Sequence, residues 1–157
     1  MSDPLLPDDA STPLSDEERE GLKLSYVTTR GDLNATEQQN ILKAQAWAFK
    51  RTNNILTRDY LNDLHRRMYG DVWTWAGTYR KTEKNLGVDP IRIQTDLREL
   101  LDNVTNWLDH ETYPPDEIAT RFHHKLVYIH AYANGNGRHA RLAADILLKE
   151  LGQQPFT

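Results

Sequence analysis

The sequence predicts an all-α helical bundle that carries one small β-hairpin flap. Three observations support this prediction. Apolar residues recur at helical spacing in several stretches, and proline or glycine residues separate those stretches. The chain has 157 residues, a length that suits one domain burying about 70% of the surface of its unfolded chain. We therefore expect a single hydrophobic core enclosed by helices.

Residues 1–33 are expected to form an N-terminal arm in front of the main domain, which we place at residues 34–157. Prolines and acidic residues crowd the start of the chain, a composition typical of segments without a packed core. Within the arm, Ser15-Asp16-Glu17-Glu18 has the form of a helix capping box. Gly21 follows within about two turns, so a helix that begins here is expected to be short and could be regulatory.

The main domain begins with two predicted helices. From Thr36, apolar side chains recur on one side of a helix. Thr57 is a suitable N-cap for a second helix, which ends at Gly70. The inward-facing residues of this second helix are Leu61, Leu64 and Met68. Both helices are therefore predicted to present an apolar face to a common core.

The segment after the second helix is rich in aromatic residues and is followed by a stretch that contains glycine and proline. Residues 82–92 contain Gly87 and Pro90, which interrupt helices and favour a hairpin or a loop. The sequence leaves a small β-hairpin flap and an ordinary connecting loop equally open.

Three further helices complete the predicted bundle. The first extends from Gln94 to about Asp109 and has regularly spaced leucines. Pro114 and Pro115 introduce the next, which extends from about Asp116 to Ile129. The last follows a Gly-Asn-Gly turn and extends from Arg138 to about Leu151.

Composition and charge narrow the functional classes. The net charge is −4, so the chain lacks the positive field that favours nucleic-acid binding. The absence of cysteine excludes disulfides and thiolate chemistry. No apolar run is long enough to span a membrane, and the N-terminus lacks the pattern of a signal peptide. We therefore expect a cytoplasmic protein that binds neither nucleic acid nor membrane.

The stretch His130–Arg141 holds the strongest functional signal in the sequence. Gly135 and Gly137 can take backbone angles closed to other residues, so consecutive N–H groups can point into one hollow. A helix that begins just behind them presents unpaired N–H groups and the positive end of its dipole, which suits a phosphate. Arg138 and Arg141 lie three residues apart on one face, where their guanidinium groups can bind further phosphate oxygens.

His130 stands at the end of an apolar helix and is predicted to face the same hollow. A neutral imidazole there could take a proton from an attacking hydroxyl, a role worth roughly 10²–10⁴ in rate. The alternative is that the Gly-Asn-Gly segment is only a turn between two helices, with His130 capping or packing against one of them. The nearby arginines favour the first interpretation, a triphosphate pocket with a general base at its mouth.

The same stretch, HAYANGNGRHAR, resembles the signature of the Fic family, H-x-F-x-[DE]-G-N-G-R-x-x-R. The matching positions are His130, Gly135, Asn136, Gly137, Arg138 and Arg141. Tyr132 replaces the phenylalanine and keeps an aromatic anchor, whereas Asn134 replaces the acid. Residues 75–80, WAGTYR, resemble the W-A-G-x-x-R segment of the family, and the order and spacing fit over roughly residues 34–152. The resemblance implies the Fic fold, a helical bundle with a β-hairpin flap.

The resemblance implies a protein adenylyltransferase, an enzyme that transfers AMP from ATP to a Tyr, Thr or Ser hydroxyl of a target protein. In that interpretation His130 is the base, while Asn136 and the N–H groups of the turn hold the α-phosphate. Arg138 would steady the β-phosphate and Arg141 the γ-phosphate while pyrophosphate leaves. Gly137 favours nucleotide transfer, because Doc-like relatives that transfer the terminal phosphate carry lysine there.

Asn134 stands where the family has the acid that holds Mg²⁺ against the phosphates. An amide oxygen can ligate a hard cation but brings no charge, so the resemblance implies a weak Mg²⁺ site. Three outcomes are open: slow AMP transfer, transfer from a different phosphorylated donor, and a nucleotide- or protein-binding module without turnover. We favour them in that order.

The resemblance also concerns target docking and regulation. In the family, a hairpin such as residues 82–89 binds an extended target segment by strand addition, and we expect Leu86, Gly87 and Val88 to contact it. Many Fic proteins are restrained by a glutamate that pairs with the second arginine of the motif. Glu20, in a Glu-Gly pair, is the candidate for that glutamate. A toxin-like or regulatory enzyme is expected, with an antitoxin-like partner as the alternative restraint.

Overall fold

The computed structural model describes residues 14–23, 29–84 and 86–154. Its regular elements in these ranges are α1 (Asp16–Arg19), α2 (Arg30–Phe49), α3 (Arg58–Tyr69), the 3₁₀ turn η1 (Pro90–Arg92), α4 (Ile93–Asp109), α5 (Pro115–Ile129) and α6 (Asn136–Glu150). The all-α prediction is confirmed. No strand occurs in the described ranges, and the expected β-hairpin is absent from them. None of the described helices combines the length and apolar character needed to cross a membrane.

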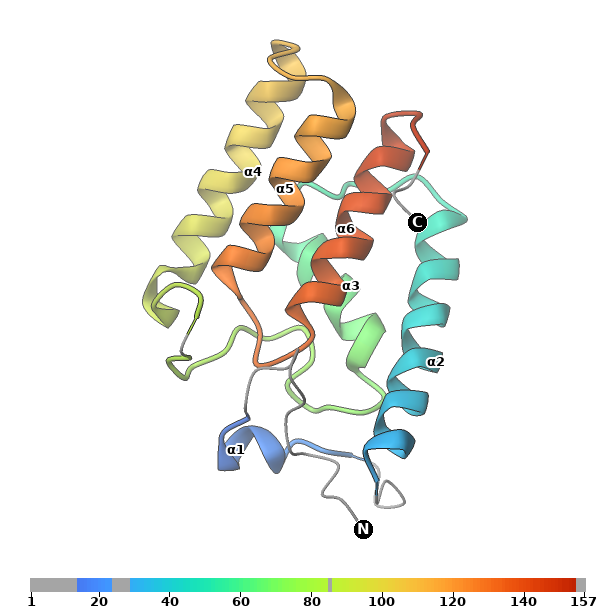
Figure 1. Ribbon diagram of the computed structural model, residues 1–157, viewed down its shortest axis with the longest axis vertical. Coiled ribbons are helices and arrows are strands. Elements are labelled where there is room, and N and C mark those ends of the chain that lie inside the picture. Colours follow the sequence, from blue (N-terminus) through green and yellow to red (C-terminus); the bar gives the residue numbers. More distant parts are fainter. Residues whose placement is uncertain (1–13, 24–28, 85, 155–157) are drawn as a thin grey trace.

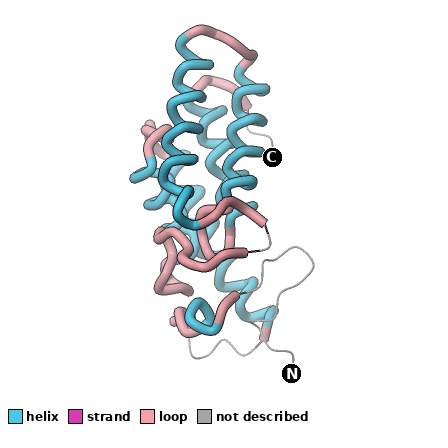
Figure 2. The backbone as a smooth tube through the Cα atoms, turned by 90° about the vertical axis from the view of Figure 1, so that its left-hand side faces the viewer, coloured by secondary structure: helices cyan, strands magenta, loops and turns pink. Residues whose placement is uncertain are grey.

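The helices form a bundle in which α5 packs between α4 and α6, while α3 packs against α2 and α6 (Figure 1). The segment that follows α3 and the turn that joins α5 to α6 lie together at one end of this bundle, with α1 beneath them. The view from the side shows the same gathering of loops below the long helices (Figure 2). The predicted functional stretch therefore lies where loops from distant parts of the chain meet.

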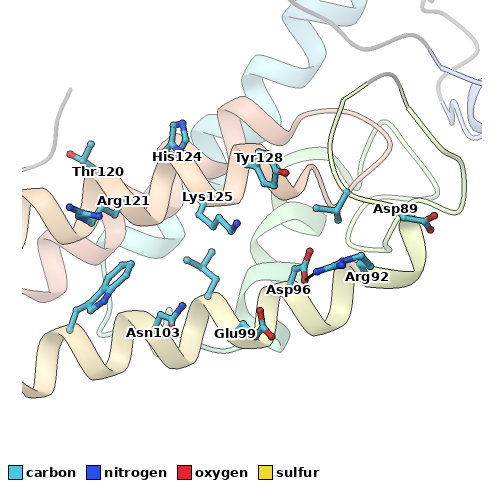
Figure 3. A pocket seen from close by; sticks show the side chains of 13 residues that line it. Asp89, Arg92, Asp96, Glu99, Asn103, Thr120, Arg121, His124, Lys125 and Tyr128 are labelled. Carbon is cyan, nitrogen blue, oxygen red and sulfur yellow. Dashed lines mark hydrogen bonds and ion pairs between the residues drawn. The ribbon is translucent and has the colours of Figure 1, made fainter.

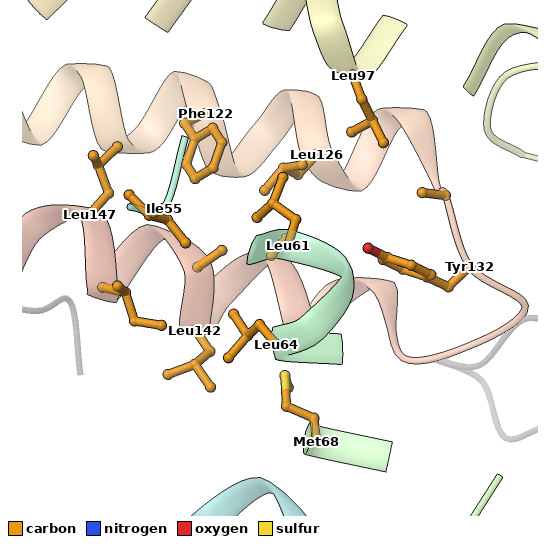
Figure 4. Close-up of a cluster of buried hydrophobic side chains, with 14 of the residues drawn as sticks. Ile55, Leu61, Leu64, Met68, Leu97, Phe122, Leu126, Tyr132, Leu142 and Leu147 are labelled. Atoms are coloured by element: carbon orange, nitrogen blue, oxygen red, sulfur yellow. The ribbon is translucent and has the colours of Figure 1, made fainter. Parts of the chain in front are cut away.

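The hydrophobic core lies where α3 meets α5 and α6 (Figure 4). Leu64 and Met68 of α3 are fully buried, and Leu61 is 1% exposed. Phe122 of α5 is also completely buried. These inward positions agree with the helical spacing of the sequence, and the rigid core fixes the helix ends that frame the loops.

The starts of α1 and α2 show how far capping residues in the sequence predict where a helix begins. The capping box of α1 is confirmed, because the Ser15 hydroxyl accepts from the Glu18 amide at 3.2 Å and the Glu18 carboxylate accepts from the Ser15 amide at 2.8 Å. The start of α2 at Thr36 was wrong. Thr29 caps this helix by accepting from the Asp32 amide at 3.0 Å, so the boundary expected at residue 34 lies inside α2.

Candidate active site

His130 is the residue at which the chain leaves α5. It caps the helix in the left-handed conformation, with φ 55° and ψ 60°. This conformation costs a residue with a side chain about 1–2 kcal/mol, so it persists only where the surroundings hold it. His130 is 7% exposed. The sequence predicted its place at the helix end but not this strained backbone.

The pKa of the His130 imidazole is lowered to about 4, because burial disfavours the charged ring and the cations of Arg80 and Lys84 repel a proton. The ring is therefore neutral at physiological pH. A neutral imidazole has a nitrogen lone pair that can accept a proton, which is the state that a general base requires.

The turn after His130 is held by the side chain of Asn136. Its carboxamide oxygen accepts from the Tyr132 amide at 2.9 Å, and its carboxamide nitrogen donates to the Tyr132 main-chain oxygen at 2.9 Å. Asn136 is 5% exposed. The sequence assigns this residue to a phosphate. In the structure its side chain turns inward, because it supplies hydrogen-bond partners for the main chain of Tyr132 that the turn itself does not provide. The main-chain N–H of Asn136 lies at the first position of α6, where a helix N–H has no carbonyl partner within the helix.

Two glycines shape the start of α6. Gly135 is its N-cap, with φ 79°, and a β-carbon at this residue would lie 2.5 Å from Cε2 of Tyr69. A β-carbon on Gly137 would meet nothing within 4 Å. No side chain caps α6, and the first N–H groups of a helix have no carbonyl partner within it. The start of α6 therefore has open space beside Gly137, while the Tyr69 ring packs against Gly135.

Arg138 is anchored by a residue that the sequence did not reveal as functional. Its Nη2 lies 3.2 Å from Oε1 of Glu37, and the other oxygen of that carboxylate accepts from Nε1 of Trp73 at 2.9 Å. Glu37 is buried, whereas the Arg138 side chain is 46% exposed. The carboxylate thus orients the guanidinium group at the edge of the hollow. Arg141 lies one turn further along α6 and is exposed.

Asn134 offers a poor donor set for a magnesium ion. Its side-chain oxygen accepts from the Gly135 amide at 2.8 Å, so part of its capacity is already used. Among the described residues, no group of three or more His, Cys, Asp or Glu side chains is placed to hold a metal. Mg²⁺ is usually held by one or two carboxylates together with substrate phosphates. Asn134 supplies no carboxylate, so its side chain fits this ion poorly.

His65 connects the WAGTYR segment to the motif loop, and no sequence signal pointed to it. It is fully buried on α3 and stacks on Tyr132 at 3.8 Å between ring centroids. Its Nδ1 accepts from the Gly77 amide at 2.9 Å, so Nε2 carries the hydrogen of the neutral ring and donates to the Asn134 main-chain oxygen at 3.0 Å. Burial lowers the pKa of His65 far below its usual value, which keeps this arrangement fixed.

The predicted flap lies beside His130, but it pairs with the α5–α6 connection rather than with itself. The Arg80 amide donates to the Ala131 main-chain oxygen at 2.9 Å, and the Val88 amide donates to the Ile129 main-chain oxygen at 3.3 Å. Gly87, with φ 89°, has its Cα so close that a β-carbon would lie 2.7 Å from Cβ of His130. The Val88 amide is thus bonded to α5 and not across the flap, and no strand occurs among the described residues of the flap. Leu86 is 52% exposed at the flap surface.

Glu20 does not reach the arginines of the motif. It is exposed at the C-terminal end of α1, and no contact between Glu20 and either arginine occurs among the described residues. Glu18 is the acid of α1 that turns inward. It forms a buried ion pair with Lys84 at 2.5 Å and accepts a hydrogen bond from Thr82 at 2.9 Å. The short helix therefore holds the flap and not the second arginine.

A separate groove of about 800 Å³ lies between α4 and α5 and ends at Val88 and Asp89 of the flap (Figure 3). Its charges are mixed, and Arg92 and Asp96 form an ion pair at 3.3 Å within it. Val88 lines this groove, and its neighbour Gly87 lies against His130.

The fold and the site define a class of protein: a helical domain with a histidine at one helix end and an open glycine turn at the start of the next. The model of the Fic/DOC family matches residues 55–148, more than half of the chain. The chain belongs to the Fic/DOC family.

Known relatives support this assignment. The protein adenylyltransferase Fic of Nematostella vectensis is 36% identical over 104 residues, which cover 64% of this chain and 24% of that protein. The chain therefore spans about a quarter of the length of the curated relatives it matches. Among solved structures, the N-terminal Fic domain of the Bartonella effector Bep8 superposes with a TM-score of 0.67 at 18% identity, covering 82% of this chain and 70% of that one. The Bartonella tribocorum effector BepC, solved with bound AMPPNP, gives 0.65 at 16% identity, with coverages of 86% and 79%.

Proposed function

We propose that this domain transfers AMP from ATP to a hydroxyl side chain of a target protein. The observation that carries the proposal is that a neutral, buried His130 and the start of α6, which no side chain caps, lie at the two ends of the same turn, residues 130–135. Relatives that share the motif are named protein adenylyltransferases, and a structural neighbour was solved with a bound ATP analogue. A mere turn between helices would require neither the open surface at Gly137 nor the anchored arginine.

The proposed reaction uses residues of this chain in three roles. The N–H groups at the start of α6 hold the phosphates, and Arg138 and Arg141 neutralise the outer ones. His130 takes the proton of the target hydroxyl. The hydroxyl oxygen then bonds to the α-phosphorus while the bond to the bridging oxygen breaks and pyrophosphate leaves. Oriented donors stabilise the charge that develops on the α-phosphate. Since the donor set at Asn134 fits Mg²⁺ poorly, we assign none of these steps to a metal ion.

The proposal extends to the partner and its docking site. We assign docking of an extended target segment to Leu86, Gly87 and Val88, because they flank His130 and because Leu86 is exposed. We also propose a toxin-like or regulatory role in the cytoplasm, where an antitoxin-like partner could restrain the enzyme. Family membership alone supports this part.

A second candidate function is a module that binds nucleotide without turnover. The neutral side chain of Asn134, at the position of the acid in the family motif, favours it. Incubation of the protein with ATP, Mg²⁺ and a cell lysate, followed by intact-mass analysis, separates the two. An AMP adduct that disappears in His130→Ala supports the enzyme. Binding of ATP without any adduct supports the module and overturns the proposed activity.

A further inference from the structure

Arg80 is a buried arginine whose guanidinium group binds main-chain oxygens instead of a carboxylate. It is 4% exposed. Its Nε donates to the main-chain oxygen of His130 at 2.5 Å and its Nη1 to that of Thr82 at 2.9 Å. Its Nη2 donates to the oxygens of Val88 at 2.5 Å and Ile129 at 3.3 Å. No carboxylate of the described residues forms an ion pair with it.

The four acceptors belong to two segments that meet at the candidate base. Two are in the flap, and two are the carbonyls on either side of His130. The peptide plane that carries the Ile129 oxygen sets φ of His130, and the plane that carries the His130 oxygen sets ψ. One guanidinium group therefore constrains both backbone angles of the strained residue. Its planar fork has a fixed geometry, which the flexible ammonium group of lysine lacks.

We propose that Arg80 is a positioning residue of the active site, which holds His130 in its left-handed conformation and joins the flap to it as one unit. A target segment docked on the flap then keeps a fixed distance from the imidazole. The catalytic consequence rests on the proposed function, whereas the structural linkage does not. Arg80 does not touch the reacting atoms and acts through His130.

The charge of Arg80 also affects His130, because it helps to keep the imidazole neutral. Burial first, and then Arg80 and Lys84, lower the pKa of His130 to about 4. Lys84 is paired with the carboxylate of Glu18, whereas the charge of Arg80 has only carbonyl dipoles around it. The carboxylates that act on Arg80 from a distance are Glu83, Glu18 and Asp89. Removal of the guanidinium group would therefore leave an imidazole that is easier to protonate.

Two substitutions separate position from charge. Arg80→Lys keeps the charge and loses the fork, and Arg80→Met loses both. Arg98→Met, an exposed arginine of α4, is the matched control. Three measurements apply to each variant. The first is hydrogen exchange of the Val88 amide, which donates to the Ile129 oxygen. The second is NMR titration of the His130 imidazole, and the third is the pH profile of AMP transfer. Exchange of amides in α3 reports whether the fold as a whole has weakened.

Both Arg80 variants are expected to speed exchange of the Val88 amide while α3 stays protected. The His130 pKa should rise toward its ordinary value in Arg80→Met and stay low in Arg80→Lys. Transfer should fall about 10²-fold in both, the loss typical of a misplaced catalytic group. Arg98→Met should change nothing.

Wild-type protection of the Val88 amide and wild-type titration of His130 in both folded variants would overturn the inference. If Arg80→Met does not fold, Arg80→Lys decides by its Val88 exchange alone. If the wild-type protein transfers no AMP, the proposed function fails, while exchange and titration still test the positioning role.

Discussion

Replacement of Gly135 by alanine tests the geometry of the motif turn most directly. Gly135 has φ 79°, and a β-carbon there would lie 2.5 Å from Cε2, 2.6 Å from Cζ and 2.8 Å from Oη of Tyr69. The Tyr69 ring is 1% exposed and sits in the core, so it cannot swing away. The added methyl group therefore meets a rigid ring and a left-handed backbone at the same position.

Both contributions to the free energy of unfolding can be estimated. The left-handed conformation costs a residue with a side chain about 1–2 kcal/mol, and forcing a methyl group into a packed core costs about 1–3 kcal/mol. We expect Gly135→Ala to lower the free energy of unfolding by about 2–5 kcal/mol. For a domain of this size, that corresponds to a fall in Tm of about 4–20 °C.

Gly137→Ala is the matched control, two residues further along the same turn. Its β-carbon meets nothing within 4 Å, and alanine should stabilise the helix by about 0.5–1 kcal/mol. Urea unfolding of both variants gives the comparison. A Gly135→Ala protein within about 0.5 kcal/mol of wild type, the scatter of neutral surface changes, would refute the reasoning. Because the new methyl group at position 137 enters the hollow, ATP binding should weaken there despite the gain in stability, and unchanged affinity would contradict the phosphate site.

Three further predictions concern the chemistry of the site and one concerns its regulation. The kcat/KM for transfer should rise with pH around a midpoint near 4, because the His130 pKa is about 4 and only the neutral ring accepts a proton. A midpoint near the ordinary histidine value of about 6.5 would contradict the role of His130 as the base. Asn134→Asp should raise both Mg²⁺ affinity and the transfer rate, measured by calorimetry and by adduct formation, since it adds a charged ligand. Glu37→Gln should raise KM for ATP several-fold with a smaller change in kcat, because Arg138 loses its ionic anchor. Glu20→Ala should change neither ATP binding nor automodification.

The other three of these predictions fail on equally definite results. If the aspartate variant binds Mg²⁺ no better and transfers no faster, the account of Asn134 is wrong. Unaltered ATP affinity in Glu37→Gln, with the fold intact by circular dichroism, would mean that Arg138 needs no anchor. An increase in automodification on removal of the Glu20 carboxylate would restore the autoinhibition hypothesis that the exposed position of Glu20 argues against.

The parts of the fold that the sequence predicted are those written in local signals. Thr57 was recognised as the N-cap of α3, and it accepts from the Tyr60 amide at 3.1 Å. Pro115 starts α5 as expected. The Gly-Asn-Gly turn was found because it needs particular residues within a few positions. Thr29 is the same kind of cap as Thr57, but it was missed because the apolar stripe becomes regular only later in α2.

The parts that the sequence could not predict depend on partners far apart in the chain. Glu37 and Arg138 are separated by 101 positions, and nothing in either neighbourhood indicates the pairing. The acceptors of Arg80 are main-chain oxygens, which every residue has and no motif can mark. The place of Asn136 in the motif assigns it to a phosphate, whereas the direction of its side chain depends on two hydrogen bonds with the main chain of Tyr132.

The ion pair between Glu18 and Lys84 has a practical consequence for anyone who trims this protein to a minimal fragment. A cut just before α2 looks harmless, because it removes only a short helix. It would remove the carboxylate partner of an ammonium group whose side chain is 6% exposed. Because a buried charge without a partner is strongly unfavourable, the ammonium group would then turn toward solvent. The positive charge of Lys84 would then move with its loop. The activity of the shortened protein would therefore reflect an altered arrangement of charges around the active site.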